Sequence, residues 1–386
     1  MKSIQKQLED EHNIPFVVLT HEPRTDVGNK ALQLVKEWGA SNLVGNMEHE
    51  VDELWRDIAV VKKAKEHGVY AEILDDTYVV PPGDVLTKEG RPYSVFSPWN
   101  RNWIDILSKR KELLEESPMP KANEKSVRSD AKLKGLFGSK IPDQVKHFEC
   151  KDREYMKKLW PEGSSAARKV LDNFIRGKGG AKVLDGPATK FSQGDVEANS
   201  KESRIARYQT GRNLMSENGS SRLSPYLSAG IISARQCLRT VRELTNGKLH
   251  VGRDSGPAAF DMEISFRDFY GHVLAAWPRV CMGRAYITKY EDVVWEYDDE
   301  SLHAWQEGRT GYPIVDASMR QGAKQGYMHN RGRMIVAMFL TKHLMHDWRE
   351  GEKWFMQNFI DGDFASNNGG WQWSASTGTD PQPIFR

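Results

Sequence analysis

A short run of small polar residues has the composition of a phosphate-binding segment. Residues 219–225 read Gly-Ser-Ser-Arg-Leu-Ser-Pro, so three hydroxyl groups and the cation of Arg222 precede a predicted helix. Ser224 suits the N-cap position and Pro225 the first helical position. Free backbone N–H groups at such a helix start can bind an anion. Most Ser-Pro helix starts only cap their helix, so capping alone stays open as the alternative.

A second candidate is the cationic start of an apolar helix. Residues 331–348 are apolar on most faces, which predicts a buried helix, whereas residues 327–333 are polar and cationic. A buried arginine needs an anionic partner, because an unpaired buried charge is strongly destabilising. Asp361 and Asp363 are the candidate partners. The resulting pair is either a structural ion pair or part of a cofactor site.

Residues 361–376 form the most unusual segment of the chain. Trp371 and Trp373 lie there among glycine, serine and asparagine, where burial on a regular element is not the obvious explanation. Aromatic side chains in such a context suit flat ligands or nucleic-acid bases. The alternative is that both are core tryptophans beneath a tight loop.

Composition excludes several classes of protein. The 386 residues contain no apolar run long enough to span a bilayer and no Walker A, His-Glu-x-x-His or paired-cysteine motif. Three scattered cysteines and a polar N-terminus predict a reducing, intracellular compartment. The net charge is −6 over residues 1–117, +9 over 118–215 and −1 over the rest. The basic stretch fits either a polyanionic partner or a solvated linker.

The elements that position these residues fall into two groups. A helical pattern over 1–11 precedes β-rich runs at 14–19, 41–44 and 69–74 that alternate with helical patterns at 29–38 and 48–66, which predicts a parallel α/β sheet. A helix over 99–116 closes this region. Helical patterns dominate afterwards, at 153–176, 233–245, 257–277, 313–326 and 331–348. We therefore predict an α/β domain over 1–116, a linker over 117–144 and an all-α domain over 145–386.

Four longer motifs carry a family resemblance. Residues 309–316 (RTGYPIVD), 327–331 (YMHNR), 347–352 (DWREGE) and 361–380, taken in this order, resemble the photolyase/cryptochrome family, most closely the class I photolyases for cyclobutane pyrimidine dimers. The resemblance implies a Rossmann-like antenna domain and a helical domain that binds FAD in a U-shaped conformation. Compared with the family pattern, the first strand and the closing helices are missing, so we expect a chain truncated at both ends.

The flavin site of the family maps onto residues already singled out above. By resemblance the FAD-binding residues are Tyr208, Ser220, Ser221, Arg222, Leu223, Ser224, Arg333, Asp361, Asp363 and Asn367. Arg333 and Asp361 correspond to the ion pair beside the flavin ring. Asn367 corresponds to the residue near flavin N5, where plant-type cryptochromes have Asp. Because a carboxamide has no titratable proton, Asn367 favours a fully reduced anionic flavin, and repair over signalling.

The resemblance also implies a substrate pocket. Its residues are Glu263, Phe266, Arg267, Asn330, Arg331, Met334 and Trp373. Photolyases for (6-4) photoproducts carry His at the positions of Asn330 and Met334, so the chain is similar to the cyclobutane-dimer type. Glu263 is expected to hydrogen-bond a base edge, and Phe266 and Trp373 to wall the extruded bases. Phe266 replaces a usual Trp, which reduces the stacking area. Without the motifs, Met334 reads as core and Glu263 as a solvated carboxylate.

The implied reaction is light-driven repair of cyclobutane pyrimidine dimers by electron transfer from excited reduced FAD, which makes the chain a carbon–carbon lyase. The alternative is a cryptochrome-type photoreceptor without repair. Trp371, Trp348 and Trp295 match the tryptophans that reduce photoexcited flavin in the family. Each of them on its own reads as a core residue.

The resemblance further suggests an antenna and a partner. Asp52, Glu53 and Cys281 fall near positions that contact a 5,10-methenyltetrahydrofolate antenna, although Met282 replaces a frequent Lys. The expected partner is UV-damaged DNA. We expect the chain to act as a monomer and not to associate with a membrane. The expected location is the nucleus, with the mitochondrion, for a eukaryotic source and the cytoplasm for a bacterial one.

Overall fold

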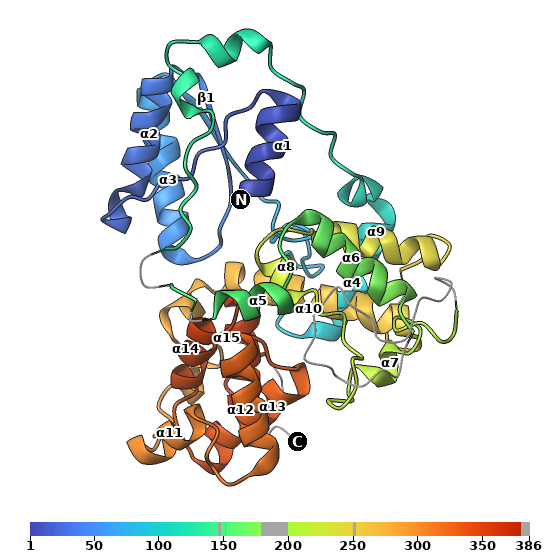
Figure 1. Cartoon of the computed structure of the whole chain (residues 1–386). Helices are drawn as coiled ribbons and strands as arrows, with labels where there is room; N and C mark the ends of the chain where they lie inside the picture. The colour runs from blue at the N-terminus through green and yellow to red at the C-terminus, as the bar shows by residue number, and fades with distance from the viewer. Residues whose placement is uncertain (146–147, 151, 179–199, 250–251, 380–386) are drawn as a thin grey trace. The chain divides into compact units, whose positions relative to one another are not determined.

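The computed structural model describes residues 1–145, 148–150, 152–178, 200–249 and 252–379. It divides into two compact units (Figure 1). Unit 1 contains Met1–Thr77 and Glu116–Glu154, and unit 2 contains Tyr78–Glu115 and Tyr155–Arg386. None of the helices within the described residues is long and apolar enough to cross a membrane.

Unit 1 contains a parallel β-α-β element. Strands β1 (Asn42–Asn46) and β2 (Tyr70–Leu74) pair in register, with Asn42 opposite Tyr70, and helix α3 (Val51–Glu66) connects them. Residues along both strands alternate between exposed and half-buried, because successive strand residues face opposite sides of the sheet. Helices α1 (Lys2–His12) and α2 (Val27–Trp38) also belong to this unit. The α/β prediction is confirmed for this part of the chain.

The strand predicted over residues 14–19 is wrong. These residues belong to no strand, and the sheet within the described part of unit 1 has two strands. Pro15 lacks the N–H group that a strand donates to its neighbour, so the apolar run here is not sufficient for pairing.

Unit 2 is built from helices. The longer ones are α4 (Phe96–Lys109), α6 (Ser164–Arg176), α9 (Ala234–Leu244), α10 (Gly256–Ala276), α11 (Asp299–Gln306), α12 (Pro313–Gln325), α13 (Asn330–Met338), α14 (Trp348–Asn358) and α15 (Phe364–Ala375). Two short helices, α7 (Tyr208–Gly211) and α8 (Ser224–Ser228), are joined by a loop. The all-α prediction is confirmed for this unit.

Two predicted helices are each interrupted. The pattern over 153–176 forms α5 (Arg153–Leu159) and α6, which are separated by Pro161 and by Gly163 at φ 92°. The pattern over 331–348 begins as α13, continues as a π-helical turn over Phe339–His343 and ends at Met345, whose φ is 57°. Apolar periodicity alone did not reveal these breaks, because the residues on both sides of each break are buried in the same core.

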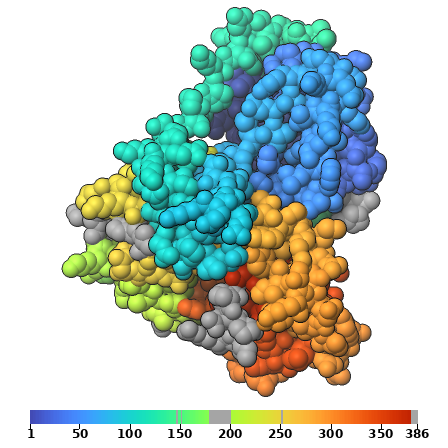
Figure 2. Space-filling model, turned by 180° about the vertical axis from the view of Figure 1, so that it is seen from behind, coloured from blue at the N-terminus to red at the C-terminus, as the bar shows by residue number. Residues whose placement is uncertain are grey.

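Residues 78–115 belong to the helical unit and residues 116–154 to unit 1, so each compact unit is made of two separate stretches of the chain. The buried carboxylate of Asp268 on α10 accepts hydrogen bonds from the backbone N–H of Val79 at 2.9 Å, from that of Val80 at 3.1 Å, and from Trp103 Nε1 at 3.0 Å. Trp103 is itself buried. Figure 2 shows this segment, in cyan, beside the yellow and orange surface of unit 2.

The predicted linker has no α-helix or strand among its described residues and belongs to unit 1. It is attached to α1 by side-chain hydrogen bonds. Gln5 Nε2 donates to the carbonyl of Ser139 at 2.8 Å, and Arg128 Nε donates to Asn13 Oδ1, just after α1, at 2.8 Å. A surface course was expected for this segment, but its attachment to the first helix was not.

Asp261 on α10 gives a test of the core. It is 2% exposed, and within the described residues neither carboxylate oxygen has a hydrogen-bond partner. Burial raises its pKa from 3.8 to about 8. The native state therefore binds the proton more tightly than the unfolded chain does, and the contribution of this group to stability falls as pH rises from about 4 to about 8.

We predict that Asp261→Asn increases the free energy of unfolding by about 1–3 kcal/mol at pH 8 and by clearly less at pH 5. Urea unfolding at both pH values measures the difference from the unsubstituted chain. The control is Asp105→Asn, which removes an exposed carboxylate that pairs with Lys109 at 2.6 Å. An equal gain at both pH values contradicts the assignment.

Candidate cofactor and substrate cavity

Unit 2 contains a cavity of about 830 Å³. Its lining comes from segments far apart in the sequence, namely residues 95–97, 220–224 and 327–334 together with helices α7, α10, α14 and α15. Every residue predicted for the flavin site or the substrate pocket lines it: Tyr208, Ser220, Ser221, Arg222, Leu223, Ser224, Glu263, Phe266, Arg267, Asn330, Arg331, Arg333, Met334, Asp361, Asp363, Asn367 and Trp373. The structure thus brings both predicted sites into one cavity.

A buried arginine donates hydrogen bonds to the backbone at the start of the serine-rich segment, residues 219–225. Arg204, 2% exposed, donates from Nε to the carbonyl of Asn218 at 3.0 Å and from Nη2 to the carbonyl of Ser220. Burial, followed by repulsion from Arg222, lowers the pKa of Arg204 to about 9. Arg222 adopts a left-handed conformation with φ 55°. No sequence signal marked Arg204, which belongs to none of the motifs and bonds to two backbone carbonyls and to Asn218 Oδ1 at 3.3 Å.

Ser224 has a different role from the predicted one. Leu223 stands at the N-cap of α8, and Ser224 is the first helical residue. Its hydroxyl donates to Asp361 Oδ2 at 2.7 Å instead of capping the helix. The N-cap prediction was therefore wrong by one residue, since Ser224 is already the first residue of α8 and its hydroxyl bonds to a carboxylate from a distant part of the chain.

Arg333 and Asp361 form the expected ion pair. Arg333 Nη2 lies 2.6 Å from Asp361 Oδ2, and Arg333 Nε donates to the carbonyl of Met328 at 2.9 Å. The side chain of Asp361 is 3% exposed. Its other oxygen, Oδ1, is buried and without a hydrogen-bond partner among the described residues. Asp363 instead caps α15, accepts from the N–H of Ser366 at 2.8 Å and lies 3.4 Å from Arg267.

Asn367 and Gly370 lie on the part of α15 that lines the cavity. Asn367 Nδ2 donates to the carbonyl of Glu352 at 3.0 Å, which fixes the carboxamide. Burial raises the pKa of Glu352 to about 7, and its side chain accepts a hydrogen bond from Asn368 at 2.8 Å. A Cβ on Gly370 would have no atom within 4 Å, so this position borders open space.

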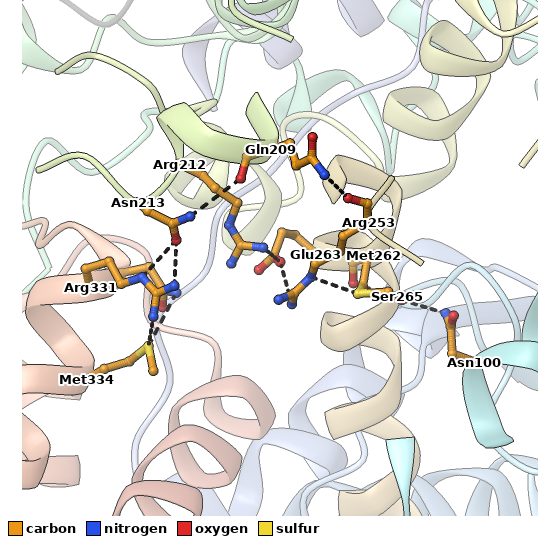
Figure 3. A network of polar contacts seen from close by, with 11 residues as sticks. Asn100, Gln209, Arg212, Asn213, Arg253, Met262, Glu263, Ser265, Arg331 and Met334 are labelled. Carbon is orange, nitrogen blue, oxygen red and sulfur yellow. Dashed lines mark hydrogen bonds and ion pairs between the residues drawn. The ribbon is translucent and has the colours of Figure 1, made fainter. Parts of the chain in front are cut away.

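Two arginines surround the carboxylate of Glu263, one of the predicted substrate residues. Glu263 Oε1 lies 2.5 Å from Arg212 Nη1 and 3.2 Å from Arg253 Nη2 (Figure 3). Arg331 donates to Asn213 Oδ1 from Nε at 2.9 Å and from Nη2 at 2.6 Å. Sequence reasoning missed Arg212 and Arg253 in this role, because neither belongs to a motif.

Phe266 is part of an aromatic stack. Its ring lies 3.6 Å from that of Phe96, centroid to centroid, at an interplanar angle of 7°. Phe96 comes from the segment 78–115, which we had assigned to the other domain. Its membership of the cavity could not be predicted from the sequence, because it depends on how that segment packs on α10.

His329 also lines the cavity and was not predicted. It caps α13 by accepting from the N–H of Arg331 at 3.2 Å through Nδ1. Burial and the neighbouring arginines, Arg331 first, lower its pKa to about 4. The ring is therefore neutral at neutral pH and adds no charge to the cavity.

The three predicted tryptophans are placed differently. Trp371 lines the cavity, whereas Trp348 and Trp295 do not. Trp371 and Trp348 share one buried cluster, and the partly buried Trp295 packs against it. A tryptophan that we did not predict, Trp305, is fully buried with its ring 6.1 Å from that of Trp371.

The predicted antenna residues are distributed over both units. Asp52 and Glu53, at the start of α3 in unit 1, each form an ion pair with Arg24. Cys281 and Met282 belong to unit 2. The folate antenna stays a prediction.

Comparisons with known proteins identify this arrangement. Residues 260–386 match the model of the FAD-binding domain of DNA photolyase, and residues 1–121 match the DNA photolyase model. The deoxyribodipyrimidine photo-lyase of Vibrio cholerae is 36% identical over 92% of this chain and 67% of its own length. That of Neurospora crassa is 40% identical over the whole chain and 59% of its own length. The chain belongs to the DNA photolyase family.

Solved structures agree on the fold. A class III photolyase from Agrobacterium tumefaciens superposes with a TM-score of 0.67 at 29% identity, over 94% of this chain and 67% of that one. A Synechocystis cryptochrome has the same TM-score at 22% identity, which concerns the fold alone. The chain spans 59% to 67% of the length of the two curated relatives named above.

The cavity fits FAD, the cofactor of the matched domain. Its volume of about 830 Å³ lies in the range of cofactor sites, about 300–1,000 Å³. The unpartnered Asp361 Oδ1 offers a buried acceptor, and the open space beside Gly370 is where a side chain would intrude. The segment from Ser220 to Ser224 offers hydroxyl and N–H groups for the pyrophosphate.

We predict that Gly370→Leu reduces the amount of FAD bound per protein about tenfold or more. The unfolding temperature of the flavin-free chain should be unchanged or higher, because Leu favours a helix over Gly by up to about 1 kcal/mol. The ratio of flavin to protein absorbance measures the loss. Gly135→Leu is the control, because it too borders open space, in unit 1. Full retention of FAD by the Gly370 variant would show that the cofactor lies elsewhere.

Proposed function

We propose that this chain repairs cyclobutane pyrimidine dimers in DNA with blue light, using reduced FAD. One observation carries the proposal: the residues predicted to hold the flavin and those predicted to recognise the damaged bases line the same cavity. Membership of the DNA photolyase family supports it. When bound, FAD supplies the light-driven electron transfer, and the residues of the chain bind, orient and shield the reactants.

The proposed flavin side of the cavity is anchored by charge. Arg333 and Ser224 both donate to Asp361 Oδ2, and Oδ1 of the same carboxylate is left for the cofactor. Asn367 presents a carboxamide whose Nδ2 is already used by the Glu352 carbonyl. A carboxamide cannot deliver a proton in the working pH range, so this position keeps its neighbour unprotonated. This property favours repair over a light sensor.

The proposed substrate side combines stacking with charge. Phe266, backed by Phe96, offers an aromatic surface, and Glu263 offers a carboxylate acceptor for a base edge.

The cavity favours binding of a polyanion. Its lining contains six arginines, Arg212, Arg222, Arg253, Arg267, Arg331 and Arg333, against three acidic residues, Glu263, Asp361 and Asp363. Binding to DNA should therefore weaken with salt. We further propose that the chain acts as a monomer and carries a methenyltetrahydrofolate antenna, as the family resemblance implies.

The deciding experiment measures the loss of dimers from UV-irradiated oligothymidine, in blue light and in the dark, with the bound FAD quantified in the same sample. The proposal predicts light-dependent loss. A chain that holds FAD but removes no dimers contradicts it and favours a light sensor.

Glu263→Gln should slow this repair about 10- to 100-fold, because a hydrogen bond to a charged acceptor contributes about 1.5–3 kcal/mol. The bound FAD should be unchanged. Glu307→Gln, which removes an exposed carboxylate that pairs with Arg309, is the control and should repair normally. Repair by Glu263→Gln at the unsubstituted rate rules out a role for this carboxylate.

Asn367→Asp tests the choice between repair and sensing. The new carboxyl group can carry a proton where the carboxamide cannot, so we expect slower repair and an altered absorption spectrum of bound FAD after illumination. Asn358→Asp, where the side chain donates to the carbonyl of Trp354 at 2.8 Å, is the control. An unchanged spectrum together with unchanged repair by Asn367→Asp would contradict the proposed role.

A further inference from the structure

The carboxylate of Glu263 is held by two arginines from different parts of unit 2. Figure 3 shows Arg212, which follows α7, and Arg253, which precedes α10, both directed at this side chain. Both ion pairs fall on the same oxygen, Oε1, at 2.5 Å and 3.2 Å. The hydrogen bond from Arg253 Nη2 is made to Oε1, and no hydrogen bond to Oε2 is found in the part of the chain that the structure describes. One oxygen is therefore fixed and the other is left for a further donor.

Arg253 is itself fixed by neighbours of the substrate residues. Its Nε donates to Met262 Sδ at 2.9 Å, and its carbonyl accepts from Gln209 Nε2 on α7. Its guanidinium carbon lies 5.8 Å from the ring centroid of Phe266, within the range of a cation–π contact. Arg253 therefore links the carboxylate of Glu263 to the aromatic surface of Phe266.

The two arginines differ in how far their side chains are exposed to solvent. The side chain of Arg212 is 11% exposed, whereas that of Arg253 is 45% exposed, so Arg253 stands on the open side of the carboxylate. An ion pair this exposed contributes only about 0–1 kcal/mol to stability. The pair is thus dispensable for folding, and its main effect is on the orientation of Glu263.

A glutamate held by a single contact can still turn about its side-chain torsions. Arg212 alone would leave Glu263 free to pivot about Oε1, whereas a second donor to the same oxygen from another direction removes this freedom. A group that recognises a ligand by one hydrogen bond must be held within about 0.5 Å of its productive position.

We propose that Arg253 is a positioning residue for damage recognition: together with Arg212 it clamps Oε1 of Glu263, so that Oε2 faces the base edge of the dimer beside Phe266. The inference rests on the proposed function, because it assumes that Glu263 recognises the damaged bases. It extends that function to a residue that belongs to none of the motifs found in the sequence.

The test measures binding in the dark, with FAD-loaded protein and a labelled oligothymidine, before and after UV irradiation. The variants are Arg253→Gln, Arg253→Lys, Glu263→Gln and the double variant Arg253→Gln/Glu263→Gln. Arg110→Gln is the matched control, because the side chain of Arg110 is 44% exposed and pairs with Asp84 at 2.5 Å. Flavin content and unfolding temperature are recorded for each variant.

Arg253→Gln should reduce the preference for irradiated over unirradiated oligonucleotide about tenfold, with unchanged flavin content, and Arg253→Lys should restore part of it. Since Arg253 acts through Glu263, adding Arg253→Gln to Glu263→Gln should change the preference less than about twofold. Arg110→Gln should change nothing.

Additive effects of the two substitutions overturn the proposal. The proposal is also overturned if Arg253→Gln weakens binding of both oligonucleotides equally and reduces the salt dependence of binding by about one phosphate contact. Arg253 would then be a simple phosphate ligand. If the unsubstituted chain shows no preference for irradiated oligonucleotide, the proposed function fails first, and this inference fails with it.

Discussion

The cavity depends on one buried carboxylate. Asp361 Oδ2 accepts from Arg333 at 2.6 Å and from Ser224 at 2.7 Å, which joins α13, the start of α8 and the segment before α15 at a single atom. A buried ion pair adds little net stability, but the loss of one partner leaves an uncompensated charge, so the three segments are strongly constrained to stay together. Asp361 Oδ1 then remains as a buried acceptor within the cavity wall.

A second constraint brings residues 78–115 to the helical unit. The Asp268 carboxylate binds the backbone at Val79 and Val80, and the indole of Trp103, inside the core. This attachment carries Phe96 to its position against Phe266. A carboxylate that looks like one more helical acidic residue in the sequence therefore determines one wall of the proposed substrate site.

Much of the cavity could be predicted from residue types, and the limits have physical causes. A buried cation needs an anionic partner, and this requirement correctly predicted that Arg333 pairs with Asp361. The same reasoning could not tell that Asp363 would cap α15, since a helix start and an ion pair both favour aspartate. Phe96 escaped prediction because its partner Phe266 lies far away in sequence, whereas Arg253 and Arg204 escaped it because they belong to none of the motifs. The basic stretch 118–215 contributes a single arginine, Arg212, to the lining, so the positive charge of the cavity arises from folding rather than from a local cluster.

The central claim is that one cavity holds both the flavin and the damaged bases. The most direct measurement is the absorption spectrum of bound FAD in the dark, recorded while UV-irradiated oligothymidine is added to the holoprotein. If both occupy this cavity, the irradiated oligonucleotide shifts the flavin bands saturably and the unirradiated one does not. Tight binding of the irradiated oligonucleotide without any change in the flavin spectrum would contradict a shared cavity.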